Sequence, residues 1–259
     1  YFGDLHVHTY LSNDAYIFNL RRTPDDAYRF ARGEAIGHAS GYTVRLNGGP
    51  LDFVAVTDHA EYLAAVREAG RPGSALNRLP FSQGLFSPDP DEIQAAFTRM
   101  TLARRAGTLP KEFNDPTIIS RAWREVQDAA ARNNQPGRFT TFVGYEYTSA
   151  PDGRNLHRNV IFRGSKVVGS PYNANMSKDP EDLWHAMDGW RAKGIEALAI
   201  YTYPAQVVFC KKPLSGLADL TGQLIVLSEL RRRDQLQSLL LNLAPELQIL
   251  HRSISYRQN

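Results

Sequence analysis

Five short apolar runs, rich in β-branched and aromatic residues, alternate with longer segments of helical periodicity, and this alternation constrains the fold more than any other feature. The runs are Phe2–Thr9, Leu51–Thr57, Phe139–Tyr147, Leu156–Arg163 and Ile195–Tyr201. Each has the length of a strand and is followed by a turn or a helix. This pattern is typical of an α/β protein with a mostly parallel sheet.

Three helices are expected from a capping residue followed by proline, at Thr23-Pro24, Asp115-Pro116 and Asp179-Pro180. Proline at the first helical position gives up an amide that would be unpaired anyway. The helix from Asp115 is predicted to run to about Asn133. Its inward face is predicted to carry Ile119, Trp123, Val126 and Ala130.

Residues 71–114 are irregular, with five prolines and several glycines. A connection of this length within one domain is unusual and is often a functional lid. The alternative is an ordinary surface insertion with its own helix at Asp91–Arg105. Both readings stay open at the sequence level.

Charge and composition exclude some classes of protein. The net charge of +3 is small for 259 residues, and the basic residues are scattered apart from Arg231–Arg233, so we expect no nucleic-acid partner. No apolar run reaches the roughly 18 residues that a membrane span requires. The single cysteine, Cys210, leaves a bacterial periplasmic, exported or cytoplasmic location equally open. Because Tyr1 already lies in the first expected strand, we expect that a further segment preceded it.

Four of the seven histidines lie at the ends of expected core strands. His6 and His8 are two residues apart on one strand, so both point to the same face, as a shared metal ion requires. His59 follows the second strand, and His157 begins the fourth. Glu146 lies near the end of the third strand, where a buried carboxylate would need compensation. Each residue alone is more often structural, but together they predict a metal site.

Asp14 adds a carboxylate in the loop after the first strand, where it either reaches the same site or is a turn residue. Imidazole and carboxylate ligands suit Zn, Mn or Fe, and a cluster of two or three such ions would hold a bridging hydroxide at neutral pH. This chemistry best supports hydrolysis of a phosphoester.

The motifs resemble those of the polymerase-and-histidinol-phosphatase (PHP) superfamily and, more closely, the DUF3604 family, from Tyr1 to about residue 200. The runs that carry the resemblance are Tyr1–Thr9, Thr57–Tyr62, Phe142–Thr148 and Asn155–Val160. The resemblance implies a distorted (β/α)7 barrel with two or three metal ions. It also implies a hydrolase that acts on phosphoesters or phosphonate esters of a small, phosphorylated substrate through a metal-bound hydroxide.

The same resemblance implies six metal ligands, with Glu146 bridging two ions. They are His6, His8, Asp14, His59, Glu146 and His157. Asn155 and Arg158 are weaker candidates for contacting a substrate phosphate, and Arg158 is equally well explained as a solvated surface residue. The sequence does not identify a catalytic residue, and it leaves the oligomeric state undefined.

The chain departs from the family pattern after Ile200, where a histidine is expected and none occurs before His251. Residues 203–222 are instead similar to solute-binding receptors of TRAP-type transporters. We therefore expect a PHP-like domain over residues 1–200 and an atypical, fused or foreign segment over residues 201–259, with a helix at Glu229–Leu243. The barrel would then be incomplete at its C-terminal end. Two alternatives to a hydrolase are a truncated or chimeric remnant without activity and a solute-binding protein. Whether the protein is an enzyme therefore stays open.

Overall fold

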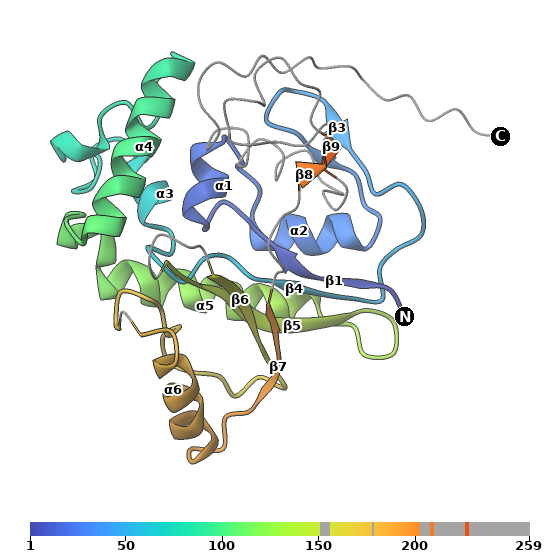
Figure 1. The fold of residues 1–259 in the computed structure, drawn as a ribbon. Helices are drawn as coiled ribbons and strands as arrows, with labels where there is room; N and C mark the ends of the chain where they lie inside the picture. Colours follow the sequence, from blue (N-terminus) through green and yellow to red (C-terminus); the bar gives the residue numbers. More distant parts are fainter. Residues whose placement is uncertain (151–155, 178, 203–207, 210–225, 228–259) are drawn as a thin grey trace. The chain divides into compact units, whose positions relative to one another are not determined.

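The computed structural model describes residues 1–150, 156–177, 179–202, 208–209 and 226–227 (Figure 1). The chain divides into two compact units, Tyr1–Tyr203 and Pro204–Asn259. In the second unit, β8 (Val208–Phe209) and β9 (Val226–Leu227) pair in antiparallel fashion. The expected helix at Glu229–Leu243 and most of the transporter-like segment lie outside the described residues.

The first unit is built on a five-stranded sheet that contains all five expected strands. In spatial order they are β1 (Gly3–Val7), β4 (Phe53–Val56), β5 (Thr140–Ser149), β6 (Leu156–Phe162) and β7 (Ala197–Thr202). A separate small hairpin joins β2 (Ile36–Gly37) to β3 (Thr43–Val44). The expected α/β class is therefore confirmed.

The strand directions differ in part from the expected parallel sheet. β1, β4 and β5 are parallel, but β6 runs antiparallel to β5, and β7 runs antiparallel to β6. The prediction is thus wrong for β6 and β7. A parallel neighbour needs a crossover of a dozen or more residues, and the link of residues 150–155 between β5 and β6 is too short.

Among the described strands this sheet is open, with β1 and β7 as its two edges and no pairing between them. A closed barrel is therefore not formed by the part of the chain that the structure describes. The incomplete PHP-like barrel stays a prediction.

Two helices cover one face of the sheet. α2 (Pro24–Ala31) and α5 (Pro116–Asn133) pack on each other and on β4 and β5. The predicted inward face of α5 is confirmed, and Trp123 is 1% exposed. Burial of each large apolar side chain stabilises the fold by about 1.5–3 kcal/mol. This face of β5 is therefore occupied by core, which leaves the opposite face for polar groups.

The predicted helix starts are largely confirmed. Thr23 forms a capping box with Asp26 at the start of α2, and Asp115 caps α5. The third helix, α6 (Asp182–Arg191), begins later than its sequence indicates. The carboxylate of Asp179 accepts a hydrogen bond from the backbone amide of Glu181 at 2.9 Å, so it closes a turn before the helix begins.

The insertion contains the expected helix, α4 (Pro90–Ala106), and two short 3₁₀ helices, η1 (Pro80–Ser82) and η2 (Lys111–Asn114). Together with α1 (Asn13–Ile17) and α3 (Ala65–Ala69) it forms a second apolar cluster. Its buried members include Leu76, Leu85, Met100 and Phe113. The insertion therefore packs into an apolar cluster that it shares with α1 and α3, and its action as a lid stays a prediction. None of the helices that the structure describes is long and apolar enough to cross a membrane.

Candidate metal centre

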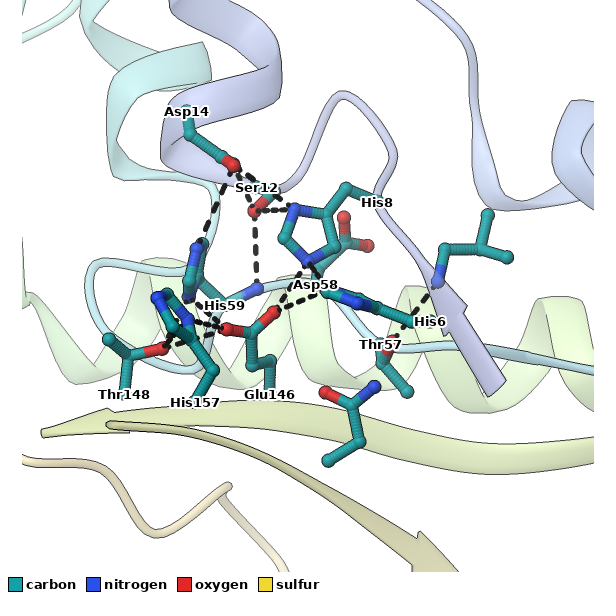
Figure 2. Close-up of polar contacts among 12 residues, drawn as sticks. His6, His8, Ser12, Asp14, Thr57, Asp58, His59, Glu146, Thr148 and His157 are labelled. Atoms are coloured by element: carbon teal, nitrogen blue, oxygen red, sulfur yellow. Dashed lines mark hydrogen bonds and ion pairs between the residues drawn. The ribbon is translucent and has the colours of Figure 1, made fainter. Parts of the chain in front are cut away.

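The six predicted ligands lie together at one end of the strands, the carboxyl-terminal end of β1, β4 and β5 (Figure 2). β1, β4 and β5 are parallel, so the residues at their carboxyl ends lie at the same edge. β6 is antiparallel, so its first residues lie at this edge too, and His157 pairs with Thr148 of β5. The side chains form three overlapping groups whose ligand atoms lie within 4.8 Å of one another.

The first group consists of His6, His8 and Glu146. Oε2 of Glu146 lies 2.8 Å from Nε2 of His6 and 2.7 Å from Nε2 of His8, and these two nitrogens are 2.9 Å apart. The register of β1 shifts between Asp4 and Val7, within the segment that carries His6. Such irregularities often redirect side chains beside functional sites. The predicted convergence of His6 and His8 on one point is confirmed.

The second group joins His8 to Asp14 and His59. Nδ1 of His8 lies 3.2 Å from Oδ2 of Asp14, and Nε2 of His59 lies 3.7 Å from the same oxygen. Ser12 supports this group, because its hydroxyl donates to Asp14 at 2.7 Å and accepts from the backbone amide of His59 at 3.2 Å. Asp14 lies in the first turn of α1 and faces the site.

The third group consists of His59, Glu146 and His157. Nδ1 of His157 is in direct contact with Oε1 of Glu146, and Nδ1 of His59 lies 3.6 Å from the same oxygen. The hydroxyl of Thr148 lies between these three side chains. It donates to Oε1 of Glu146 at 2.9 Å and lies 3.0 Å and 3.1 Å from Nδ1 of His59 and of His157.

Backbone hydrogen bonds beyond the end of β4 hold His59 beside Glu146. The amide of Ala60 donates to the carbonyl of Glu146 at 2.8 Å, and the amide of Glu146 donates to the carbonyl of Asp58 at 3.0 Å. The Asp58 side chain accepts hydrogen bonds from Thr9 at 2.5 Å (amide) and 2.7 Å (hydroxyl), which ties the loop after β1 to the loop after β4. The ligands of both loops are therefore positioned by the sheet.

Burial and charge make the centre attractive to a cation. Burial lowers the pKa of His6 and lowers that of His59 to about 4, so both imidazoles are neutral at pH 7. Burial also disfavours a charged His8, but Asp14 and Glu146 raise its pKa well above the usual value.

The two carboxylates stay ionised. Burial alone would raise the pKa of Glu146, but the electrostatic effect of His59 and hydrogen bonds from the other imidazoles hold it well below its usual value. His8 and His59 lower the pKa of Asp14 against the same effect of burial. The two ionised carboxylates supply negative charge that a divalent cation would neutralise.

The donor set and spacing fit a metal ion. Imidazole nitrogens with carboxylate oxygens suit Zn, Mn or Fe. Ligand atoms at about 2.0–2.1 Å from a tetrahedral zinc are separated from one another by about 3.3 Å. The three ligand atoms of the first group, now 2.7–2.9 Å apart, would therefore have to move apart by about half an ångström. Glu146 is fully buried, and a buried carboxylate surrounded by imidazoles is otherwise costly. The residues could therefore hold a metal ion, whose identity and number stay predictions.

The structure assigns Arg158 to the other face of the sheet. Its guanidinium lies 5.9 Å from the ring centroid of Tyr147 and donates to Ser149 at 3.4 Å. Neighbouring strand residues point to opposite faces, so Arg158 faces away from His157. The suggestion that it contacts a phosphate at the metal centre is therefore wrong, because strand alternation outweighs its position in the sequence. Asn155, the other suggested contact, lies outside the described residues.

Sequence reasoning missed Ser12, Glu61, Thr148 and Asn159. Glu61 is buried, and its carboxylate accepts hydrogen bonds from the backbone amides of Thr148 at 3.1 Å and Ala174 at 2.9 Å. The Asn159 amide donates to the carbonyl of Leu5 at 2.7 Å, which ties β6 to β1. Strand alternation could have indicated Thr148 and Asn159, since they lie two residues from Glu146 and His157.

Together the fold and the site define an α/β protein with a buried imidazole and carboxylate centre, of metal-binding geometry, at one edge of a mixed sheet. A family model described as a protein of unknown function (DUF3604) matches residues 1–204, and the chain belongs to this family. No curated protein and no solved structure matches the chain.

Proposed function

We propose that His6, His8, Asp14, His59, Glu146 and His157 bind divalent metal and that the protein is a PHP-type hydrolase of small phosphoesters or phosphonate esters. The observation that carries this proposal is the convergence of two histidine Nε2 atoms on one oxygen of the buried Glu146 carboxylate, at 2.7 and 2.8 Å. When His8 loses its ring proton, these three atoms offer two imidazole nitrogens and a carboxylate oxygen within 3 Å of one another, and a divalent cation can take the place of the proton.

A divalent cation supplies positive charge for phosphoryl oxygens and lowers the pKa of a bound water. The residues of the chain hold and orient this charge. Asp14 and His157 are the most accessible of the six, each with a side chain 33% exposed, whereas Glu146 is fully buried. A small substrate would therefore approach over Asp14 and His157.

The three groups share members, so the sites for two or three ions would be coupled. His8 belongs to the first and second groups, His59 to the second and third, and Glu146 to the first and third. The carboxylate of Glu146 is the one group whose two oxygens face different imidazoles, which supports the bridging role that the resemblance implies.

A metal-binding remnant without turnover is the second candidate. It is favoured by the open sheet among the described strands and by the absence, from the sequence, of any histidine between Ile200 and His251. The solute-binding reading depends on residues 203–222 alone, most of which lie outside the described part.

Metal analysis and a phosphoester screen test the proposal together. We expect the purified protein to contain Zn, Mn or Fe and to hydrolyse an aryl phosphodiester or phosphonate ester. Both properties should be lost in the double variant His6→Ala, His8→Ala. The matched control is His38→Ala, His185→Ala, which removes two exposed histidines far in sequence from the site.

The two candidates predict different results. Bound metal without activity towards any ester would support the remnant and contradict the hydrolase. Equal metal content in the two double variants would contradict both.

A further inference from the structure

We infer that Thr148 is a positioning residue whose hydroxyl holds His59 in the form protonated at Nδ1, so that only Nε2 of His59 is available to a metal ion. This inference rests on the proposed metal centre and extends it to a residue that is not itself one of the six ligands. It concerns the hydrogen-bond geometry of the chain's own side chains.

The Thr148 hydroxyl has as many partners as it can satisfy. A hydroxyl donates once and accepts twice, and that of Thr148 faces Oε1 of Glu146, Nδ1 of His59 and Nδ1 of His157 at 2.9, 3.0 and 3.1 Å. An ionised carboxylate only accepts, so Thr148 must donate to Glu146. Both imidazoles must then donate to Thr148 from Nδ1.

The carboxylates around His59 lie at similar distances from its two ring nitrogens, so the Thr148 hydroxyl decides between them. Nδ1 of His59 lies 3.6 Å from Glu146 and 4.0 Å from Oε2 of Glu61, whereas Nε2 lies 3.7 Å from Asp14. Nδ1 of His157 contacts Oε1 of Glu146 directly, which also requires a proton on that nitrogen. All contacts of the third group therefore agree on one assignment of protons.

This assignment has a consequence for metal binding. A neutral imidazole protonated at Nδ1 can bind metal only through Nε2. Nε2 of His59 faces Asp14 at 3.7 Å, in the second group. Thr148 thus directs the free nitrogen of His59 towards Asp14. In the third group both imidazole nitrogens that face Thr148 carry protons, so an ion could bind there only after these protons are lost. Residues that orient ligand histidines in this way typically change metal affinity 10–100-fold.

The test compares Thr148→Val, which keeps the shape but removes the hydroxyl, with Thr148→Ser, which keeps the hydroxyl. Nitrogen NMR of metal-free protein with labelled histidine at pH 8, where an unperturbed imidazole is neutral, reports which ring nitrogen carries the proton. We expect His59 to be protonated at Nδ1 in the wild type and in Thr148→Ser. In Thr148→Val the proton should move towards Nε2, where Asp14 attracts it.

Zinc titration provides a second measurement on the same three proteins. Zinc affinity should fall about 10–100-fold in Thr148→Val and recover in Thr148→Ser. A wild-type His59 protonated at Nε2 would overturn the inference even if Thr148→Val failed to fold. An unchanged His59 in a folded Thr148→Val would also overturn it.

Failure of the proposed metal centre would give a different result in these two measurements. In that case the wild type binds no zinc, while the tautomer of His59 in the metal-free protein still decides the role of Thr148.

Discussion

His157 and Glu146 are in direct contact although they come from strands that run in opposite directions. The contact joins the second residue of β6 to the carboxyl-terminal part of β5, where Thr148 and His157 are register partners. A parallel β6 would place its first residues at the other edge of the sheet. The reversal between β5 and β6 is thus what brings the fourth histidine to the centre.

Replacement of Glu146 by glutamine should abolish metal binding while keeping the fold. Glutamine keeps the shape of the side chain but removes the charge, and Glu146 belongs to two of the three groups. Loss of an orienting partner of a ligand typically costs 10–100-fold in affinity, so we expect the loss of this shared group to cost more than about 100-fold. Zinc affinity by calorimetry is the measurement. Glu92→Gln, at an exposed position of α4, is the control, and equal affinities of the two variants would contradict the role of Glu146.

Replacement of Gly144 by alanine should destabilise the protein by about 1–3 kcal/mol through overpacking. A Cβ at this position would lie 2.9 Å from Cδ1 of Ile161 and 2.9 Å from the carbonyl oxygen of Val160. The glycine two residues before Glu146 is thus required by the close approach of β5 and β6. Urea unfolding measures the effect. At Gly164 a Cβ would meet nothing within 4 Å, so Gly164→Ala should leave the unfolding free energy nearly unchanged.

Replacement of Trp123 by phenylalanine should cost about 1–3 kcal/mol, because the buried carbonyl of Val168 loses its donor. Nε1 of Trp123 donates to this carbonyl at 2.7 Å and fastens residues 163–177 to α5. Trp184→Phe is the matched control, since Trp184 is 45% exposed and should change stability by less than about 0.5 kcal/mol. Similar midpoints of urea unfolding for the two variants would contradict the assigned role of the indole.

Replacement of Asp25 by asparagine should lower stability at pH 7 but not at low pH. Burial alone would raise the pKa of Asp25, but hydrogen bonds from Arg132 at 2.8 Å and Asn133 at 2.7 Å lower it below 3.8. A depressed pKa in the folded state stabilises the protein above the unfolded value, and this contribution is lost as the pH falls through the folded pKa.

The contribution of Asp25 should be below about 1 kcal/mol, because the pair is substantially exposed. The measurement is the difference in unfolding free energy between wild type and Asp25→Asn as a function of pH. It should shrink towards zero below about pH 3.8. Asp128→Asn, at an exposed position of α5, is the control. A difference that is constant across this range would contradict the ion pair.

The sequence by itself determined the local elements and most of the candidate centre. Strand-length apolar runs with β-branched residues, and proline after a capping residue, depend only on neighbours in the chain, so the five strands of the main sheet and the starts of α2 and α5 were predictable. The grouping of His6 and His8 followed from the two-residue repeat of a strand. The sequence also carried the family motifs from Tyr1 to about residue 200.

Only the tertiary structure decided strand direction and the partners of each ligand atom. β6 runs against β5 because only residues 150–155 link the two strands, too few for the crossover that a parallel strand needs, and the direction decides which end of the sheet each residue occupies. The direction of β6 places His157 at the candidate centre and Arg158 near Tyr147, on the other face of the sheet. The hydroxyl of Thr148 acquires its three partners from β5, from β6 and from the loop after β4. Such contacts join residues far apart in the chain, so no local pattern could specify them.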